Sequence, residues 1–289
     1  MTVEYRTLGR TNERVSVLGF GGTGIGMNSY LSEWDPDEQL KESTHAIERA
    51  IELGVNYFDT AALYGRGKSE TILGNILQPH RDKLYLATKV RAADSDGVRE
   101  SIEGSLERLQ TNQIDLLQYH GEWITDEIFD DFMKPNGILA GLQAVQEEGL
   151  VRHIGFTSEG VTGAVSRLIE TEAFDVMQIQ YNLLFQHPCD PDKKQGVMYE
   201  AEAKNMGIVL MRTFTGGVFQ KWIPQAAPEH HEQIDFHKSL LSFALSNPMT
   251  DVALADMRRK DWVESNCAVS DDTTSRIDLN ALFSRFPKR

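Results

Sequence analysis

Residues 54–70 read Gly-Val-Asn-Tyr-Phe-Asp-Thr-Ala-Ala-Leu-Tyr-Gly-Arg-Gly-Lys-Ser-Glu, and the fold prediction begins with this stretch. Its start, from Val55 to Phe58, is a short apolar and aromatic run that indicates a buried strand. The glycines at 65 and 67 then interrupt the chain before a helical pattern. Asp59 and Tyr64 therefore follow the C-terminal end of a strand. In a parallel barrel, the loops at that end of the strands converge on one mouth, where catalytic groups are found.

The rest of the chain repeats a strand followed by a helix. Helices are expected over residues 37–53, 68–77, 97–109, 136–148, 160–172, 195–205, 235–246 and 259–268. The intervening strands are expected to end near Gly21, Asp59, Lys89, His120, Thr157, Gln180, Met211 and Ala255. This alternation predicts an α/β protein, a closed (β/α)8 TIM barrel, with one domain over residues 1–289. Residues 4–19 alternate weakly and predict an N-terminal β-hairpin that covers the bottom of the barrel.

Two later strands also end in polar residues. Residues 84–89 form an apolar strand that ends in Lys89, and residues 114–120 end in His120. With Asp59 and Tyr64, these side chains could meet at one mouth. Taken singly, the tyrosine could be a packed loop aromatic, the histidine a structural residue and the aspartate the start of a turn. Lys89 is harder to explain in that way, because an ammonium at the end of an apolar strand is costly without a partner.

Segments spread over nearly the whole chain resemble the aldo-keto reductase superfamily, and its bacterial members in particular. They are Asn-Tyr-Phe-Asp-Thr-Ala at 56–61 with Leu-Tyr-Gly at 63–65, Thr-Lys at 88–89, Gln-Tyr-His at 118–120, Gly-Leu-Val-Arg-His-Ile-Gly at 149–155 and Gln-Ile-Gln-Tyr-Asn at 178–182. The resemblance implies an NADP(H)-dependent oxidoreductase, of the aldo-keto reductase or alcohol dehydrogenase type. Such an enzyme interconverts an aldehyde, ketone or sugar carbonyl and an alcohol by hydride transfer.

The resemblance also implies a role for each of four catalytic residues. Tyr64 is the general acid in reduction and the general base in oxidation. Lys89 assists it, because an ammonium beside a phenol favours the phenolate. Asp59 holds Lys89 charged and oriented through an ion pair, and His120 donates a hydrogen bond to the substrate carbonyl.

The segment Gly19-Phe-Gly-Gly-Thr-Gly24 matches the Gly-x-Gly-x-x-Gly spacing of a Rossmann turn. Residues 27–36, however, do not continue as a helix, and no acidic strand end follows about twenty residues later. We interpret the segment as the first barrel loop. By resemblance, Gly21, Gly22 and Thr23 line the cofactor cleft.

The resemblance places further residues at the two ends of the cofactor. Those implied at the nicotinamide are Thr157, Ser158, Gln178 and Arg212, with Ser158 in place of an asparagine and Arg212 in place of an aromatic residue. At the adenosine end it implies Arg258 and Asn266, with Asp256 replacing a glycine. Residues 258–260 form a cationic cluster at a helix start that suits a 2′-phosphate, so NADP is favoured, with NAD as the alternative. A solvated charge run is the other interpretation of this cluster.

Composition excludes several classes of function. A net charge of −14 disfavours nucleic acid as a partner. The two cysteines, Cys189 and Cys267, lie far apart and suggest free thiols, with neither a disulfide framework nor a metal site. No signal peptide or membrane span is recognised, which makes a cytoplasmic enzyme the default.

The long segments 121–135 and 213–234 are expected to be loops that shape the substrate pocket.

Two other functions stay open. A barrel protein of this kind could bind the nucleotide and serve a regulatory partner with little turnover. It could alternatively be an isomerase or lyase that uses no nicotinamide. Neither the substrate nor the oligomeric state follows from the sequence.

Overall fold

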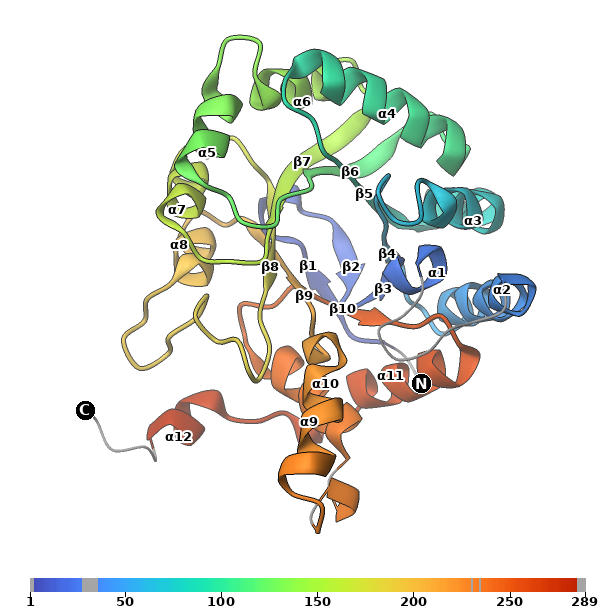
Figure 1. The fold of residues 1–289 in the computed structure, drawn as a ribbon, viewed down its shortest axis with the longest axis vertical. Helices are drawn as coiled ribbons and strands as arrows, with labels where there is room; N and C mark the ends of the chain where they lie inside the picture. The colour runs from blue at the N-terminus through green and yellow to red at the C-terminus, as the bar shows by residue number, and fades with distance from the viewer. Residues whose placement is uncertain (1–2, 28–35, 230, 234, 285–289) are drawn as a thin grey trace.

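Parallel strands close into a barrel in the computed structural model, which describes residues 3–27, 36–229, 231–233 and 235–284. In these residues the strand order around the barrel is β10-β3-β4-β5-β6-β7-β8-β9 (Figure 1). The strands are β3 (Leu18–Gly21), β4 (Tyr57–Asp59), β5 (Tyr85–Val90), β6 (Ile114–Tyr119), β7 (Val151–Ser158), β8 (Val176–Gln180), β9 (Gly207–Met211) and β10 (Val252–Asp256). The predicted (β/α)8 barrel is confirmed, and each strand ends within one residue of the expected position.

Helices cover the outside of the barrel, as the alternating pattern predicts. They are α2 (Pro36–Glu52), α3 (Lys68–Leu77), α4 (Ser95–Leu109), α6 (Ile138–Glu147), α7 (Gly163–Glu170), α8 (Val197–Ala203), α10 (Phe236–Ser246) and α11 (Lys260–Asp271). Side-chain caps set several of the starts. Thr162, for example, accepts a hydrogen bond from the Val165 amide, so α7 begins at residue 163 and not at the expected 160.

Some segments predicted as loops contain helices. The segment 121–135 holds α5 (Asp126–Met133), and the segment 213–234 holds α9 (Val218–Ala226), although residue 234 lies outside the described residues. Shorter helices are α1 (Thr23–Gly26) and α12 (Leu279–Ser284), with 3-10 turns at Gly9–Thr11, Gln78–Lys83, Thr215–Gly217, His231–Gln233 and Thr273–Ser275. Most of the stretch 27–36, on which the Rossmann motif was rejected, is not described. The segment 19–24, interpreted as the first barrel loop, contains the end of the barrel strand β3 (Leu18–Gly21) and the start of α1 (Thr23–Gly26).

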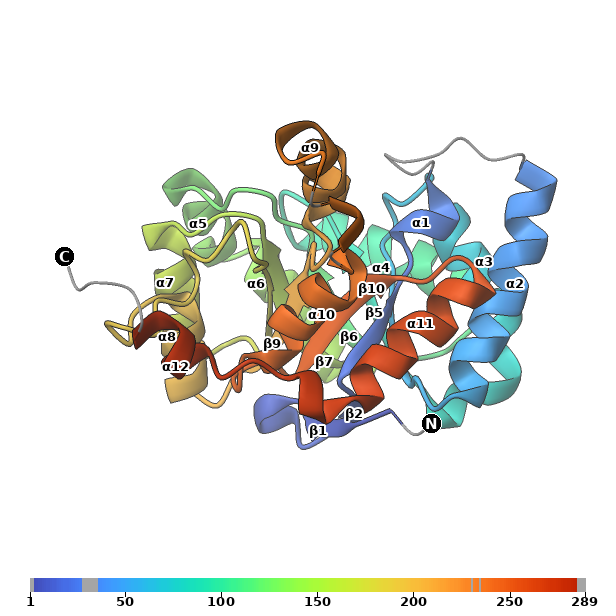
Figure 2. The same cartoon turned by 90° about the horizontal axis from the view of Figure 1, so that it is seen from below.

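The N-terminal hairpin pairs β1 (Tyr5–Thr7) with β2 (Arg14–Ser16) in antiparallel register. Leu8 and Val15, from this hairpin, are fully buried in one cluster with residues of the barrel interior such as Tyr57, Tyr85 and Leu116. Figure 2 shows the hairpin below the barrel, on the side opposite α9. The hairpin therefore closes the bottom of the barrel, as predicted, and leaves the C-terminal ends of the strands free for a site.

Neither cysteine is in a disulfide, and both Cys189 and Cys267 are buried. Within the described ranges, no helix combines the length and the apolar character that crossing a bilayer requires.

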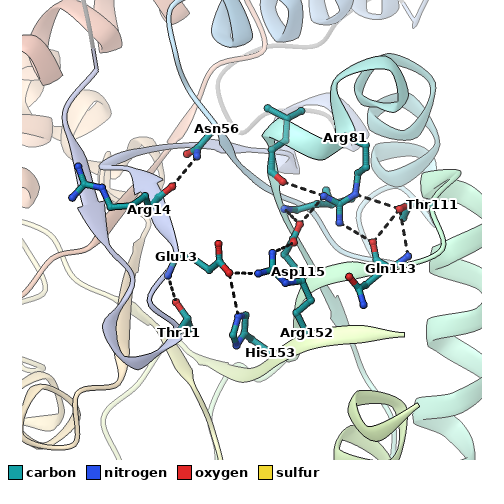
Figure 3. A network of polar contacts seen from close by, with 12 residues as sticks. Thr11, Glu13, Arg14, Asn56, Arg81, Thr111, Gln113, Asp115, Arg152 and His153 are labelled. Atoms are coloured by element: carbon teal, nitrogen blue, oxygen red, sulfur yellow. Dashed lines mark hydrogen bonds and ion pairs between the residues drawn. The ribbon is translucent and has the colours of Figure 1, made fainter. Parts of the chain in front are cut away.

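A polar network ties the hairpin to the base of the barrel (Figure 3). Its centre is the buried carboxylate of Asp115, which lies 2.7 Å from Arg81 and 2.9 Å from Arg152 and accepts a hydrogen bond from the Leu86 amide. Arg152 also pairs with Glu13, which precedes β2. The network thus joins β5, β6 and β7 to the hairpin.

Replacing Asp115 by asparagine should destabilise the protein, because two guanidinium groups lose their common anionic partner. We expect a loss of about 2–3 kcal/mol in the free energy of unfolding. This is below the ~3–5 kcal/mol typical of a fully buried pair, because the Arg81 and Arg152 side chains keep 20% and 40% of their exposure. Urea denaturation measures the change. As a control, Glu148→Gln breaks the exposed ion pair with Arg99 and should leave stability within error of wild type. Equal effects of the two substitutions would contradict the assignment of Asp115 as the centre of the base network.

Candidate active site

A sharp turn between β4 and α3 carries Tyr64. We call residues 60–67 the tyrosine turn. Residues 65, 66 and 67 all have positive φ angles, of 62°, 57° and 88°. A Cβ atom added at Gly65 would lie 2.1 Å from the Gly26 carbonyl oxygen, so both the backbone angle and the space require glycine there. The turn holds the Tyr64 side chain at the mouth of the barrel, next to the end of β5.

Lys89 connects the groups of this site. Its Nζ atom lies 2.5 Å from Asp59 Oδ1, 2.8 Å from the Thr60 carbonyl oxygen and 3.3 Å from the Tyr64 hydroxyl. An ammonium has three N–H donors, and these three partners use all of them. Lys89 and Asp59 are 1% and 2% exposed, so the ion pair is buried from solvent.

Burial of this pair disfavours the charged form of each partner. Burial disfavours the ammonium of Lys89, but the charges of Asp59 and Tyr64 outweigh it and raise the pKa of Lys89 above its ordinary value. Burial also raises the pKa of Asp59, against the opposing attraction of Lys89 and a hydrogen bond from Gln118. At neutral pH the arrangement keeps a protonated lysine against the Tyr64 hydroxyl.

His120 follows β6 directly and packs against Tyr64. The ring centroids are 5.6 Å apart and the planes meet at 85°. Burial, together with the cations Lys89 and Arg91, lowers the pKa of His120 to about 3. Its Nδ1 atom is buried and has no hydrogen-bond partner among the described residues. The imidazole at the mouth is therefore neutral.

Two side-chain amides form a row that extends from Asp59 across the barrel: that of Gln178, which was predicted, and that of Gln118, which the sequence prediction did not single out. Gln118 Nε2 lies 3.4 Å from Asp59 Oδ2 and 3.1 Å from Gln178 Oε1. Gln118 was noticed only as part of a motif. Its position two residues before His120 was the available signal, because alternate residues of a strand point to the same side.

The structure places the predicted nicotinamide residues on three adjacent strands or their ends. Gln178 is buried in the amide row. The hydroxyls of Thr157 and Ser158 are engaged by backbone, donating to the carbonyl oxygens of Gly121 and Gly160 at 2.8 and 2.7 Å. Arg212 has a φ of 56° and forms an ion pair with Glu159. Gln178 is therefore the member of this set that is connected to Asp59, through Gln118.

The segment 21–26, which includes Gly21, Gly22 and Thr23 of the predicted first barrel loop (19–24), packs directly on the tyrosine turn. We call it the glycine loop. The Gly22 amide donates to the Asp59 carbonyl oxygen at 2.7 Å. Thr23 begins α1. The loop also meets β10, since a Cβ at Gly24 would lie 2.4 Å from Asp256 Oδ1.

The predicted adenosine-binding residues lie around the start of α11. Arg258 is fully buried, 5.1 Å from the centre of the Trp262 ring, and burial lowers its pKa. Asn266 is also buried, and its side chain contacts His237 Nε2 at 2.5 Å and the Asp256 carbonyl oxygen at 3.4 Å. His237, whose ring also stacks on Phe214, was not predicted, because no local pattern relates α10 to α11.

Comparisons with known proteins identify the family and agree with the fold. The family model described as "Aldo/keto reductase family" matches residues 17–258. The chain is 34% identical over 164 residues to L-galactose dehydrogenase of Arabidopsis thaliana and 30% identical over 247 residues to the uncharacterised oxidoreductase YrpG of Bacillus subtilis. The first alignment covers 54% of this chain and 48% of the relative, the second 75% and 68%. For several of the matched curated relatives, the chain thus spans only about half of their length.

Solved structures share the fold. An aldo-keto reductase from Bacillus halodurans, in its holo form, superposes with a TM-score of 0.76 at 21% identity, over 96% of this chain and 93% of the other. An aldo-keto reductase from Klebsiella pneumoniae in complex with NADPH gives 0.74 at 20% identity, over 100% and 98%. With the family match over residues 17–258, these observations lead to one conclusion: the chain belongs to the aldo/keto reductase family of oxidoreductases.

Proposed function

We propose that this protein is an NADP(H)-dependent oxidoreductase that interconverts a small carbonyl compound and its alcohol, with Tyr64 as the general acid and base. One observation carries the proposal: the buried Lys89 ammonium contacts both the Asp59 carboxylate and the Tyr64 hydroxyl. Burying an ammonium at this depth costs free energy, which its contacts with Asp59 and Tyr64 must offset.

The chain's own residues would divide the reaction as follows. When bound, the nicotinamide supplies or accepts the hydride. The Tyr64 hydroxyl delivers a proton to the oxygen that becomes the alcohol, and takes it back in the reverse direction. Lys89 favours the ionised phenol that remains, and Asp59 keeps Lys89 charged and in place. His120, as a neutral imidazole, donates a hydrogen bond that orients the same oxygen.

The residues around the mouth fit a dinucleotide. Gln118 Oε1 is buried and has no hydrogen-bond partner in the described part of the chain, beside Gln178, which suits a ligand carboxamide. We place Gln178, Thr157, Ser158 and Arg212 at the nicotinamide end and the glycine loop, with Gly21, Gly22 and Thr23, along the middle. Arg258 and Asn266 belong to the adenosine end. A buried guanidinium with a lowered pKa gains from an anionic ligand, which favours NADP at Arg258.

A substrate panel tests the proposal. Aldehydes, ketones and sugars are incubated with NADPH or NADH, and the absorbance of the reduced cofactor is followed. Turnover with NADPH is expected. Tight NADPH binding with no turnover on any carbonyl would favour the regulatory alternative, and absence of NADPH binding would favour an isomerase or lyase.

Tyr64→Phe should lower turnover by about 10²- to 10⁴-fold, because it removes only the transferable proton. NADPH affinity, measured by quenching of tryptophan fluorescence, should stay within a few-fold of wild type. Should the variant keep more than about a third of the wild-type turnover while chemistry limits the rate, Tyr64 is not the acid.

Arg258→Ala should weaken NADPH binding by about ten- to a hundredfold and leave NADH binding nearly unchanged, because only NADPH carries the 2′-phosphate. Arg167→Ala is the control, since Arg167 lies on α7, is exposed and pairs with Asp126 at 3.0 Å. Dissociation constants for both cofactors are measured on the three proteins. Equal losses for NADPH and NADH in Arg258→Ala would place the phosphate elsewhere.

The lowered pKa of His120 predicts a pH dependence of stability. The unfolded chain binds a proton at His120 below about pH 6.5, whereas the folded chain binds it only near pH 3. The free energy of unfolding should therefore fall by about 1.4 kcal/mol per pH unit as the pH drops through this window. In His120→Gln that contribution is absent. Asp251, whose pKa burial raises to about 6, acts with the opposite sign but is present in both proteins and cancels. Parallel stability curves for the two proteins between pH 4 and pH 7 would show that His120 is not held neutral.

A further inference from the structure

We propose that Ser69 is a positioning residue that couples the glycine loop to the tyrosine turn, so that the placement of the cofactor and of Tyr64 depend on each other. The proposal rests on the function proposed above. Ser69 lies in the first turn of α3 and is fully buried. It touches neither the substrate nor the reacting atoms, and acts through its neighbours.

Three hydrogen bonds place Ser69 between the two segments. Its hydroxyl donates to the Gly22 carbonyl oxygen at 2.8 Å and accepts from the Thr60 hydroxyl at 2.7 Å. Its amide donates to the Tyr64 carbonyl oxygen at 3.2 Å. The buried side chain of Ser69 therefore joins the loop expected to hold the cofactor to Thr60, the first residue of the tyrosine turn, and the backbone amide of Ser69 contacts Tyr64 in the same turn.

The connection continues to the ion pair. The carbonyl oxygen of Thr60 accepts a hydrogen bond from Lys89 at 2.8 Å, and the Gly22 amide donates to the carbonyl oxygen of Asp59 at 2.7 Å. Ser69, Gly22, Asp59 and Thr60 thus form a closed ring of covalent and hydrogen bonds next to Lys89. A shift of the glycine loop is transmitted through this ring to the ammonium that contacts Tyr64.

The glycine loop and the tyrosine turn are packed too closely for one to move without the other. A Cβ atom at Gly26 would lie 2.8 Å from Ser69 Cβ and 2.8 Å from the Tyr64 carbonyl oxygen. A Cβ at Gly22 would lie 2.7 Å from Ser69 Oγ. In a close-packed interior, such contacts pass a displacement on instead of absorbing it.

A serine meets the requirements of this position better than its nearest replacements. Its hydroxyl donates one hydrogen bond and accepts another, and alanine would leave the Thr60 hydroxyl and the Gly22 carbonyl oxygen buried without this partner. Threonine would add a methyl group in a fully buried environment where Gly26 already lies close.

The test uses Ser69→Ala, Thr60→Val and the double variant. Ser16→Ala is the matched control, because Ser16 is equally buried and also donates to a backbone carbonyl oxygen at 2.8 Å, at the base of the barrel. Hydride transfer to 4-nitrobenzaldehyde is followed in single turnovers, once with NADPH and once with NADPH that carries deuterium at the transferred position. NADPH affinity is measured separately.

Ser69→Ala should slow hydride transfer by about 10- to 100-fold, since misplacement by about 1 Å has effects of this size. NADPH binding should weaken about tenfold. Because both variants break the same chain of hydrogen bonds, the double variant should be no slower than about the slower single variant. Ser16→Ala should lower the melting temperature to a similar extent without changing either quantity. If Ser69→Ala lowers only the melting temperature, or if the Ser69 and Thr60 effects multiply, the coupling is refuted.

Hydrogen exchange of the cofactor-free protein tests the coupling without any activity. Peptides covering residues 19–27 and 60–70 should both lose protection in Ser69→Ala and keep it in Ser16→Ala. Loss of protection in only one of the two segments would overturn the proposal. If wild type neither binds NADPH nor turns over, the proposed function fails, and the exchange result still decides whether Ser69 couples the two segments.

Discussion

The ion pair between Lys89 and Asp59 is the interaction around which the mouth of the barrel is arranged. Two charges that are 1% and 2% exposed are stable only if their mutual attraction and further hydrogen bonds offset the loss of water. The 2.5 Å contact, the Thr60 carbonyl oxygen and the Tyr64 hydroxyl supply these interactions for Lys89. On the other side, Gln118 supplies one for Asp59. The same contacts that stabilise the buried ammonium of Lys89 therefore hold it against the Tyr64 hydroxyl.

The parallel barrel makes this pair possible. Strands β4 and β5 are neighbours in register, with Asp59 opposite Ala87, so Lys89 extends two residues further along its strand and reaches back to the end of β4. His120 arrives from the end of the next strand, and Gln178 from β8. Four groups that are up to 119 residues apart in the sequence therefore meet because the C-terminal ends of parallel strands face one opening.

The two ends of the barrel have different tasks. At the base, the network around Asp115 pairs this carboxylate with two guanidinium groups and joins the hairpin to the barrel. At the mouth, Arg66 of the tyrosine turn has a positive φ of 57°, and buried polar atoms of His120 and Gln118 lack hydrogen-bond partners in the described residues. The Tyr57 and Tyr85 hydroxyls of the lower cluster also lack such partners there, so backbone strain next to Tyr64 is the feature that is typical of a functional site.

Much of the fold followed from local pattern. The alternation of apolar strands and amphipathic helices predicted the barrel, and the ends of the strands were placed within one residue. Asp59, Lys89 and His120 could be selected because each stands at the end of a predicted strand, and Tyr64 because it lies in the turn that follows one. The helices α5 and α9 were missed. They lie in long segments that were interpreted as loops, and each helix is too short to show a clear helical periodicity in the sequence.

Other features depended on contacts between distant segments. Ser69 and Gln118 are ordinary polar residues in sequence. Ser69 gains its partners where the glycine loop packs on the tyrosine turn, and Gln118 gains one where the closed barrel brings its side chain to Gln178 on β8. The burial of Arg258 and the contact of Asn266 with His237 are likewise set by how α10 and α11 pack. The sequence by itself therefore determined the order of the elements and the chemical groups at the strand ends. Local periodicity marks where each strand ends, and the residue at that position is read directly. The tertiary structure determined which polar atoms meet, because hydrogen-bond partners and burial depend on distances between residues that the local pattern does not relate.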